Sequence, residues 1–189
     1  LALSPGRKLG LLGASGAGKS TLLGLLTGML AGEGSIEIAG TRLSRRTRGQ
    51  VRQTLGLVMQ NPDDQLFHPG VLEDVSFGPR NQGCSQEEAA RRATEALEQL
   101  GLAGFERRLC HELSYGEKRR VALAGVLAMR PSVIALDEPF ANLSPGMTTR
   151  LAEMIAGLDA TVLLVTQQLI EALPCCDELA LLDGGRLKA

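Results

Sequence analysis

The sequence predicts an α/β fold with a mostly parallel β-sheet flanked by helices, and two observations support this prediction. First, short runs such as Val133 to Leu136 and Thr161 to Val165 are apolar or β-branched, which is typical of strands buried on both faces. Second, these runs alternate along the chain with longer segments of helical periodicity. Such alternation indicates parallel pairing, because each crossover helix returns the chain to the same end of the sheet.

The first third of the chain is expected to hold strands and one helix around glycine-rich turns. A strand at Lys8 to Leu12 leads through a glycine-rich loop into a helix from about Lys19 to Leu30. A short strand is expected within Gly32 to Gly40, between turn glycines. The apolar run Leu55 to Gln60 ends on a glutamine, and prolines and acids in the loop 61–70 disfavour regular structure.

The middle region, Pro62 to Arg108, is expected to form a mainly helical lobe. Ser85 and Glu88 give the capping-box pattern S-x-x-E, and apolar residues continue at helical spacing until Gly101. The remaining expected elements are a helix at Gly116 to Met129, a strand at Val133 to Leu136, a helix near Met147 to Leu158, and strands at Thr161 to Val165 and Glu178 to Leu182.

Charge and composition argue against a nucleic-acid partner or a membrane span. Lys and Arg total 20 against 21 Asp and Glu, so the chain lacks the basic excess of a duplex-binding protein. One Tyr, four Phe and no Trp leave little for a base-stacking platform. The longest apolar stretch, Leu22 to Ala31, is well under the roughly 20 residues of a membrane helix. None of the four cysteines forms a C-x-x-C pair, so reduced thiols are expected.

The strongest motif is GASGAGKST, which fits G-x-x-x-x-G-K-[ST] between an apolar strand and a helix. Glycines let the backbone N–H groups turn towards phosphate oxygens, and the helix start adds its positive dipole end. Lys19 can reach the β- and γ-phosphates and Ser20 can ligate Mg²⁺. The alternative is a glycine-rich turn that matches by chance. The expected phosphate-binding residues are Gly13, Ala14, Ser15, Gly16, Ala17, Gly18, Lys19, Ser20 and Thr21.

A second motif places two acids at the end of the strand in VIALDEP. Burying the charge of an acid at the end of a strand costs free energy unless the carboxylate contacts a cation or water. We expect Asp137 to hold Mg²⁺ and Glu138 to polarise the water that attacks the γ-phosphate. The alternative is an acid pair that caps a helix. Together the two motifs indicate an ATPase site.

The segment LSYGEKRRVALAGVLAMRP, Leu113 to Pro131, with Asp137 soon after it, resembles the signature region of ABC-transporter ATPases. Tyr115 and Glu117 depart from the usual L-S-G-G-Q. Gln60 matches the Q-loop glutamine of the family, and QNPDDQLF resembles the Q-loop of cobalt, nickel and vitamin importers of the energy-coupling-factor type.

The resemblance implies a head-to-tail dimer that sandwiches two ATP molecules. Ser114 and Gly116 would contact the γ-phosphate held by the opposite subunit, and Gln60 would sense Mg²⁺ and the attacking water. The implied partners are a second ABC ATPase, in a homo- or heterodimer, and an integral membrane subunit at the cytoplasmic face of the cell membrane. One ABC-type domain, 1–189, is expected, with its P-loop core in 1–61 and 132–189 and a helical subdomain in 62–131. Because Leu1 enters a core strand almost directly, part of an N-terminal β subdomain is expected to be missing.

Three positions depart from the family pattern. No aromatic residue precedes the phosphate loop to stack on adenine, and Ser144 stands where the family usually has aspartate. In TVLLVTQQL, Gln167 occupies the position of the switch histidine and Gln168 that of the following aspartate. A neutral amide cannot supply an imidazolium, so we expect ATP binding with slow hydrolysis.

Two other functions compete with a transport ATPase. A subunit that binds ATP without hydrolysing it could hold a heterodimer together. A soluble ABC ATPase of DNA repair would need a long coiled coil between Lys19 and Ser114, yet only about 95 residues separate them and they carry no sustained heptads. A translation ATPase usually carries two such domains in one chain.

Overall fold

The computed structural model describes residues 1–188 and divides the chain into two compact units. We call Leu1–Gln60 with Ser132–Ala189 the sheet unit, and Asn61–Pro131 the helical unit. The predicted α/β fold with a mostly parallel sheet is confirmed. No helix within residues 1–188 is long and apolar enough to cross a membrane.

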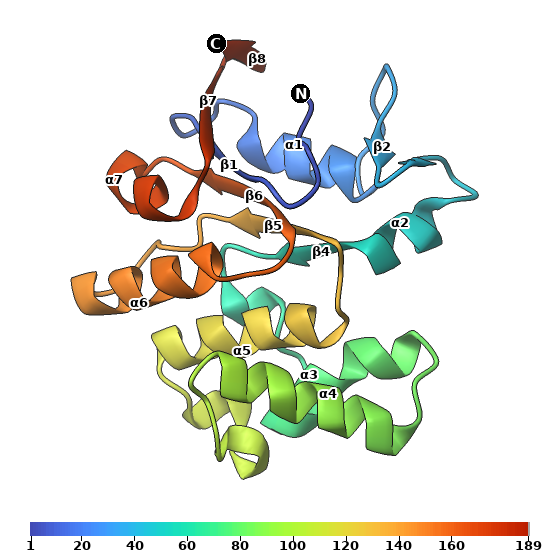
Figure 1. The fold of residues 1–189 in the computed structure, drawn as a ribbon, viewed down its shortest axis with the longest axis vertical. Helices are drawn as coiled ribbons and strands as arrows, with labels where there is room; N and C mark the ends of the chain where they lie inside the picture. The colour runs from blue at the N-terminus through green and yellow to red at the C-terminus, as the bar shows by residue number, and fades with distance from the viewer. Residues whose placement is uncertain (189) are drawn as a thin grey trace. The chain divides into compact units, whose positions relative to one another are not determined.

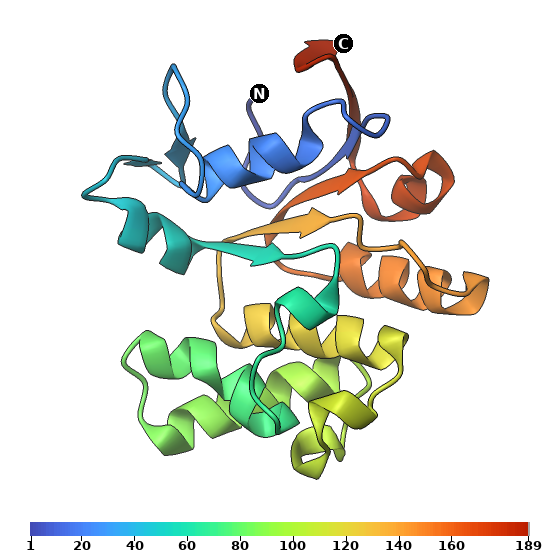
Figure 2. The same ribbon diagram turned by 180° about the vertical axis from the view of Figure 1, so that it is seen from behind.

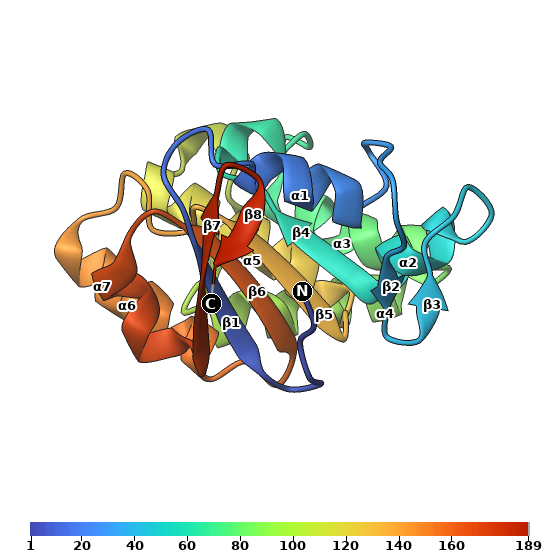
Figure 3. The same ribbon diagram turned by 90° about the horizontal axis from the view of Figure 1, so that it is seen from above.

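The sheet unit is built on a six-stranded sheet in the order β4-β5-β6-β1-β7-β8 (Figure 3). The strands are β1 (Lys8–Leu12), β4 (Leu55–Val58), β5 (Val133–Asp137), β6 (Thr161–Thr166), β7 (Glu178–Asp183) and β8 (Arg186–Lys188). All neighbouring pairs are parallel except β7 with β8. Strand β6 is buried at every position, as its continuous apolar run predicts.

The register brings the carboxyl ends of three central strands to one edge of the sheet. Leu12 of β1 lies beside Thr166 of β6, and Asp137 of β5 lies beside Val165. The loops that leave these strands therefore start side by side, although they lie far apart in the sequence. In open parallel sheets, ligands bind at this edge.

Helices lie on both sides of the sheet. Figures 1 and 2 show α1 (Lys19–Leu26) on one face and α6 (Pro145–Ala156) on the other. Helix α2 (Arg48–Thr54) runs directly into β4, and α7 (Leu169–Ala172) with the short 3-10 turn η4 (Leu173–Cys175) follows β6. Apolar side chains of β1, β6 and α1 share one core cluster that includes Leu9, Leu11, Leu23, Leu163 and Val165.

One expectation for the first third of the chain is wrong in extent, and another is confirmed. Helix α1 ends at Leu26 rather than Leu30, because Gly28 adopts a positive φ of 65° and Met29 N–H turns back to the carbonyl of Gly24. The short strand expected within 32–40 is β2 (Glu37–Ile38), which pairs with β3 (Thr41–Arg42). Ala39 and Gly40 both have positive φ, as a tight hairpin turn requires.

The helical unit packs three helices against one another: α3 (Val71–Asn81), α4 (Gln86–Gln99) and α5 (Tyr115–Ala128). Ser85 caps α4 by accepting a hydrogen bond from Glu88 N–H, as its pattern predicts. Short 3-10 turns connect the helices at η1 (Pro62–Asp64), η2 (Phe105–Arg107) and η3 (Cys110–Glu112). The expectation that residues 61–70 lack regular structure fails at η1, where the Asn61 side chain caps the turn through Asp63 N–H.

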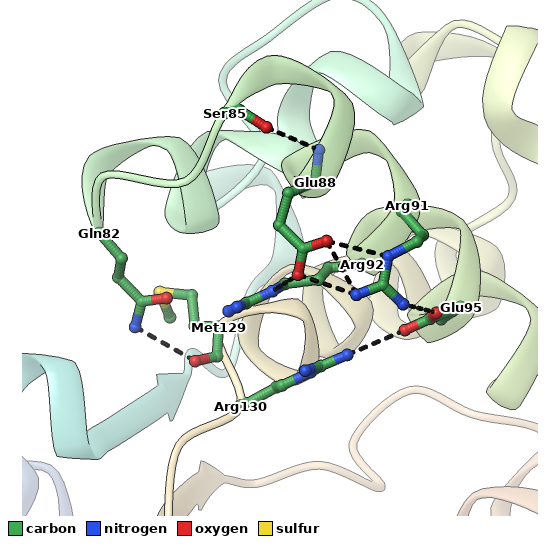
Figure 4. A network of polar contacts seen from close by, with 8 residues as sticks. All are labelled: Gln82, Ser85, Glu88, Arg91, Arg92, Glu95, Met129 and Arg130. Carbon is green, nitrogen blue, oxygen red and sulfur yellow. Dashed lines mark hydrogen bonds and ion pairs between the residues drawn. The ribbon is translucent and has the colours of Figure 1, made fainter.

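Polar contacts join α4 and the end of α3 to the end of α5 (Figure 4). Glu95 of α4 pairs with Arg130 at 3.1 Å, and Gln82 donates to the Met129 carbonyl at 3.1 Å. Arg130 has a φ of 53°, so it ends the helix in the left-handed conformation that glycine usually takes. Side-chain contacts thus support a backbone turn that is strained for arginine.

A substitution at Gly13, the residue after β1, would test how closely the backbone is packed at this edge of the sheet. A Cβ atom there would lie 2.7 Å from the backbone oxygen of Leu182 and 3.1 Å from the Cβ of Ala17. Since backbone cannot yield as a side chain does, Gly13→Ala should lower the free energy of unfolding by about 1–3 kcal/mol. Gly146→Ala, at a helical position with no atom within 4 Å of the added carbon, should raise it by up to about 1 kcal/mol, because alanine favours the helix. Equal chemical denaturation midpoints for the two variants would contradict this packing argument.

Candidate functional site

The loop between β1 and α1 forms a nest of backbone N–H groups. Gly16 and Gly18 have φ values of 80° and 102°, so side chains at these positions would strain the loop. Gly18 is the residue before α1, whose first helical residue is Lys19. The free N–H groups of the first helical turn and the positive end of the helix dipole therefore meet at this loop, an arrangement suited to an anion.

A cavity of about 250 Å³ lies over this loop, and all the residues that line it belong to the sheet unit. It joins the loop to side chains from the ends of β4, β5 and β6. The lining residues are Ser15, Gly16, Gly18, Lys19, Ser20, Thr21, Gln60, Asp137, Glu138 and Gln167. The structure therefore brings the expected catalytic and metal-binding residues and six of the nine expected loop residues around one space, whereas Gly13, Ala14 and Ala17 do not line it.

Lys19 is buried and points back over the loop. Its Nζ donates to the carbonyl oxygens of Gly13 at 2.8 Å and Ala14 at 3.1 Å, and it lies 3.3 Å from Glu138 Oε1. The side chains of Lys19 and Glu138 are only 8% and 7% exposed. A buried ion pair needs further hydrogen bonds to offset desolvation, and the two carbonyls supply them to the ammonium.

Glu138 is held in a strained backbone conformation. Its φ is 44°, in the left-handed region that glutamate rarely adopts. Its own N–H donates to the Val165 carbonyl at 2.8 Å, which ties it to β6. Its Oε2 accepts from Thr166 Oγ1 at 2.9 Å and from Gln167 N–H at 3.2 Å. Such strain persists only where surrounding contacts fix the residue, and it is common at functional sites.

Ser20 and Asp137 form an oxygen-rich corner of the cavity. Ser20 Oγ lies 3.4 Å from Asp137 Oδ2. A hydroxyl and a carboxylate are hard oxygen donors, which fit Mg²⁺ better than a soft metal. Within residues 1–188, no three His, Cys, Asp or Glu side chains cluster as a metal site. A Mg²⁺ ion here would therefore complete its shell with water and phosphate oxygens, its usual way of binding.

Gln60 and Gln167 reach the same cavity from two different strands. Gln60 follows β4, and Gln167 follows β6 directly after Thr166. Both residues are exposed, whereas Thr166 is fully buried. The backbone N–H of Gln167 holds Glu138, so this residue contributes to the site even without a histidine ring.

Thr166 is a site residue that the motifs do not reveal. Besides donating to Glu138, its Oγ1 accepts from Gln168 N–H at 3.0 Å. The available signal is a hydroxyl at the last position of a strand that is otherwise apolar after Thr161. Identifying its partner required the pairing of β5 with β6, which only the tertiary structure supplies.

The two expected signature residues stand in the helical unit, at the start of α5. Ser114 is the N-cap of this helix, and Gly116 is in its first turn. Ser114 and Glu117 form a capping box, in which each side chain bonds to the other residue's backbone N–H. Neither Ser114 nor Gly116 is among the described residues that line the cavity.

Sequence comparison gives a consistent set of relatives. The family model described as "ABC transporter" matches residues 1–141. A putative ABC transporter ATP-binding protein of Streptomyces avermitilis is 45% identical over 185 residues, which span 97% of this chain and 71% of the relative. The energy-coupling factor transporter ATP-binding protein EcfA of Methanocaldococcus jannaschii is 46% identical over 157 residues, or 82% of this chain and 56% of that protein.

Solved structures agree with the sequence relatives. The structure of cbiO1 from Clostridium perfringens, described as part of the ABC transporter complex cbiONQ, has a TM-score of 0.91 and 33% identity. It is matched over 100% of this chain and 78% of its own. A dimeric post-hydrolysis structure of the ATP-binding cassette MJ0796, bound to ADP and Pi, has a TM-score of 0.86 and 27% identity over 100% of this chain and 87% of its own.

Thr166 provides a test of how Glu138 is positioned. Thr166→Val removes the hydroxyl that donates to the carboxylate, so kcat for ATP hydrolysis should fall about 10-fold or more, with little change in ATP affinity. Thr161→Val is the matched control, because Thr161 lies in the same strand and its hydroxyl accepts from Gly6 N–H at 2.9 Å, away from the cavity. Steady-state kinetics should show the fall in kcat only for Thr166→Val. An equal fall in both variants would mean that strand stability, not the position of Glu138, limits the rate.

Proposed function

The chain belongs to the ABC transporter family, as an ATP-binding subunit with ATPase activity, and we propose that it drives an importer of the energy-coupling-factor type. In this proposal, ATP closes a dimer of ATPase subunits, and hydrolysis reopens it to couple the cycle to uptake of a metal ion or a vitamin. The Q-loop run QNPDDQLF and the relatives named EcfA and cbiO1 support this importer type.

One observation carries the proposal: the cavity that joins the phosphate loop to Lys19, Asp137, Glu138 and two glutamines. Backbone N–H groups of the glycine-rich loop and of the start of α1 bind the phosphates, and Lys19 neutralises them. The N–H groups of Gly13 and Ala17 instead donate to the carbonyls of Thr166 and Ala14. Ser20 and Asp137, with Gln60 in the same cavity, would hold Mg²⁺, which would supply positive charge that neutralises the phosphates. Gln60 and Gln167, which line the same cavity, orient the attacking water.

The ion pair between Lys19 and Glu138 suggests how nucleotide binding frees the Glu138 carboxylate to act as a general base. Lys19 Nζ lies within 3.3 Å of both Glu138 and the carbonyl of Gly13, so its charge is shared. A γ-phosphate competes with Glu138 for this ammonium. Glu138 then keeps its hydrogen bonds to Thr166 and to Gln167 N–H, which hold its carboxylate in place to accept a proton from water.

A complete site needs a second ATPase subunit. We infer that Ser114 and Gly116, at the N-terminus of α5, bind the γ-phosphate held by the opposite subunit. The dimeric MJ0796 cassette and the named cbiONQ complex support an ATPase pair joined to a membrane subunit. The chain would then lie at the cytoplasmic face of the membrane as one ABC-type domain, with its core in 1–61 and 132–189 and a helical subdomain in 62–131.

Gln167 favours a second candidate function, a weakly hydrolysing subunit of an asymmetric heterodimer. The side chain at this position lines the phosphate cavity, where an imidazolium would add a charged donor and an amide adds only a neutral one. Binding groups such as Lys19 and Ser20 are intact, so ATP would still hold the dimer together. A partner ATPase with histidine at its own switch position would then carry most of the turnover.

Gln167→His tests whether the missing imidazole limits the rate. Because one well-placed transition-state contact is worth roughly 10²- to 10³-fold, the substitution should raise kcat of the assembled complex by about 10-fold or more. Gln168→His is the matched control, since Gln168 lines a different groove, with residues of α6 and α7. Phosphate release by the membrane complex measures both. An unchanged or lower rate in Gln167→His would rule out slow hydrolysis caused by this residue.

Asp137→Asn tests the metal site without relying on turnover. Loss of the carboxylate charge should raise the Mn²⁺ concentration for half occupancy about 10-fold or more, measured by electron paramagnetic resonance with a non-hydrolysable ATP analogue. Asp159→Asn, an exposed acid in the turn before β6, should leave it unchanged. Identical Mn²⁺ affinities in the two variants would place the cation elsewhere.

A further inference from the structure

The hydroxyl of Ser114 is bound to an acid of its own helix. Ser114 Oγ donates to Glu117 Oε2 at 2.7 Å, and Ser114 N–H donates to the same oxygen at 2.7 Å. These two hydrogen bonds are the leading causes that hold the pKa of Glu117 below its ordinary value, so Glu117 is ionised near neutral pH. A negative charge therefore stands directly behind the signature serine.

This arrangement conflicts with binding of a γ-phosphate at Ser114. A serine hydroxyl has one hydrogen, which Glu117 already receives. To donate to a phosphate, the hydroxyl must turn away from Glu117, and an ionised carboxylate would then lie close to a second anion. The repulsion is large at such short range unless a cation neutralises the carboxylate.

Arg108 supplies that cation from the segment before the signature. Its Nη1 donates to Glu117 Oε1 at 3.0 Å, on the carboxylate oxygen that Ser114 does not use. The other nearby cation, Lys118, pairs with Asp63 at 2.6 Å. Because Arg108 binds Oε1, Oε2 can keep its hydrogen bond from Ser114 N–H when the hydroxyl exchanges Glu117 for a phosphate.

Further contacts fix the Arg108 side chain and backbone. The guanidinium lies 4.5 Å from the centre of the Phe105 ring and donates to the Glu112 carbonyl at 3.5 Å. The backbone of Arg108 donates to the Phe105 carbonyl and accepts from Val71 N–H of α3. An arginine held in this way loses little further conformational entropy when it pairs with a carboxylate.

We propose that Arg108 is a positioning residue that neutralises Glu117 and so allows Ser114 to bind the anionic γ-phosphate of ATP held by the opposite subunit. The inference rests on the proposed function, because it needs a dimer in which the signature faces ATP. Arg108 itself does not touch the nucleotide. Its contribution is to make an acidic signature, with Glu117 in place of glutamine, compatible with a phosphate.

The test uses the membrane complex purified through a tag on the full chain, with ATP as the ligand. Arg108→Gln should raise the ATP concentration for half-maximal hydrolysis about 5-fold, because it exposes the phosphate to the Glu117 charge, with a smaller effect on kcat. In a Glu117→Gln background the same substitution should change this concentration by less than about 2-fold, since no charge remains to neutralise. Arg108→Lys, which keeps the charge, should stay near the wild type.

Arg107→Gln, at the exposed neighbouring position, is the matched control and should have no effect. An Arg108→Gln variant that behaves like the wild type would overturn the proposal. So would a double variant that is as impaired as Arg108→Gln alone, because the role of Arg108 would then be structural. A structural role would also be indicated if Arg108→Gln lowered the melting temperature and the added Glu117→Gln substitution did not restore it. If the wild-type complex neither hydrolyses ATP nor contains a second ATPase subunit, the proposed function itself fails, and the inference fails with it.

Discussion

Strand β6 sets the geometry on which the functional site depends. It is buried along its whole length and pairs with β5 on one side and β1 on the other. These two pairings align the exit of the phosphate loop from β1 with the acids that end β5. Parallel pairing needs residues brought together from distant parts of the sequence, so the site forms only when the sheet forms.

The alignment creates a local concentration of charge that the fold must offset. Lys19 and Glu138 are both buried, and each is satisfied by backbone groups or by the hydroxyl of Thr166. Every one of these contacts comes from the sheet edge or the phosphate loop. Replacing the pair with apolar residues could give an equally stable sheet, so its presence is better explained by nucleotide chemistry than by stability.

The sequence alone predicts the elements of this arrangement that depend on local residue patterns. The buried strands are visible as apolar runs, the phosphate loop as glycine spacing, and the α4 cap as Ser85 with Glu88. The early end of α1 and the short hairpin at Ala39 and Gly40 depend on backbone angles that composition does not specify. Contacts such as Thr166 with Glu138, or Arg108 with Glu117, were beyond prediction because they depend on side-chain positions in the folded structure.

The left-handed conformation of Glu138 opposes the demand of the backbone to the demand of a buried charge. Glycine would adopt a φ of 44° without strain, whereas a glutamate there costs on the order of 1 kcal/mol. Loss of the carboxylate, however, would leave the Lys19 ammonium buried without its ion-pair partner, which costs about 3–5 kcal/mol. The charge of Lys19 therefore keeps an acid at a backbone position that suits glycine, and the two residues can be replaced without a large loss of stability only together.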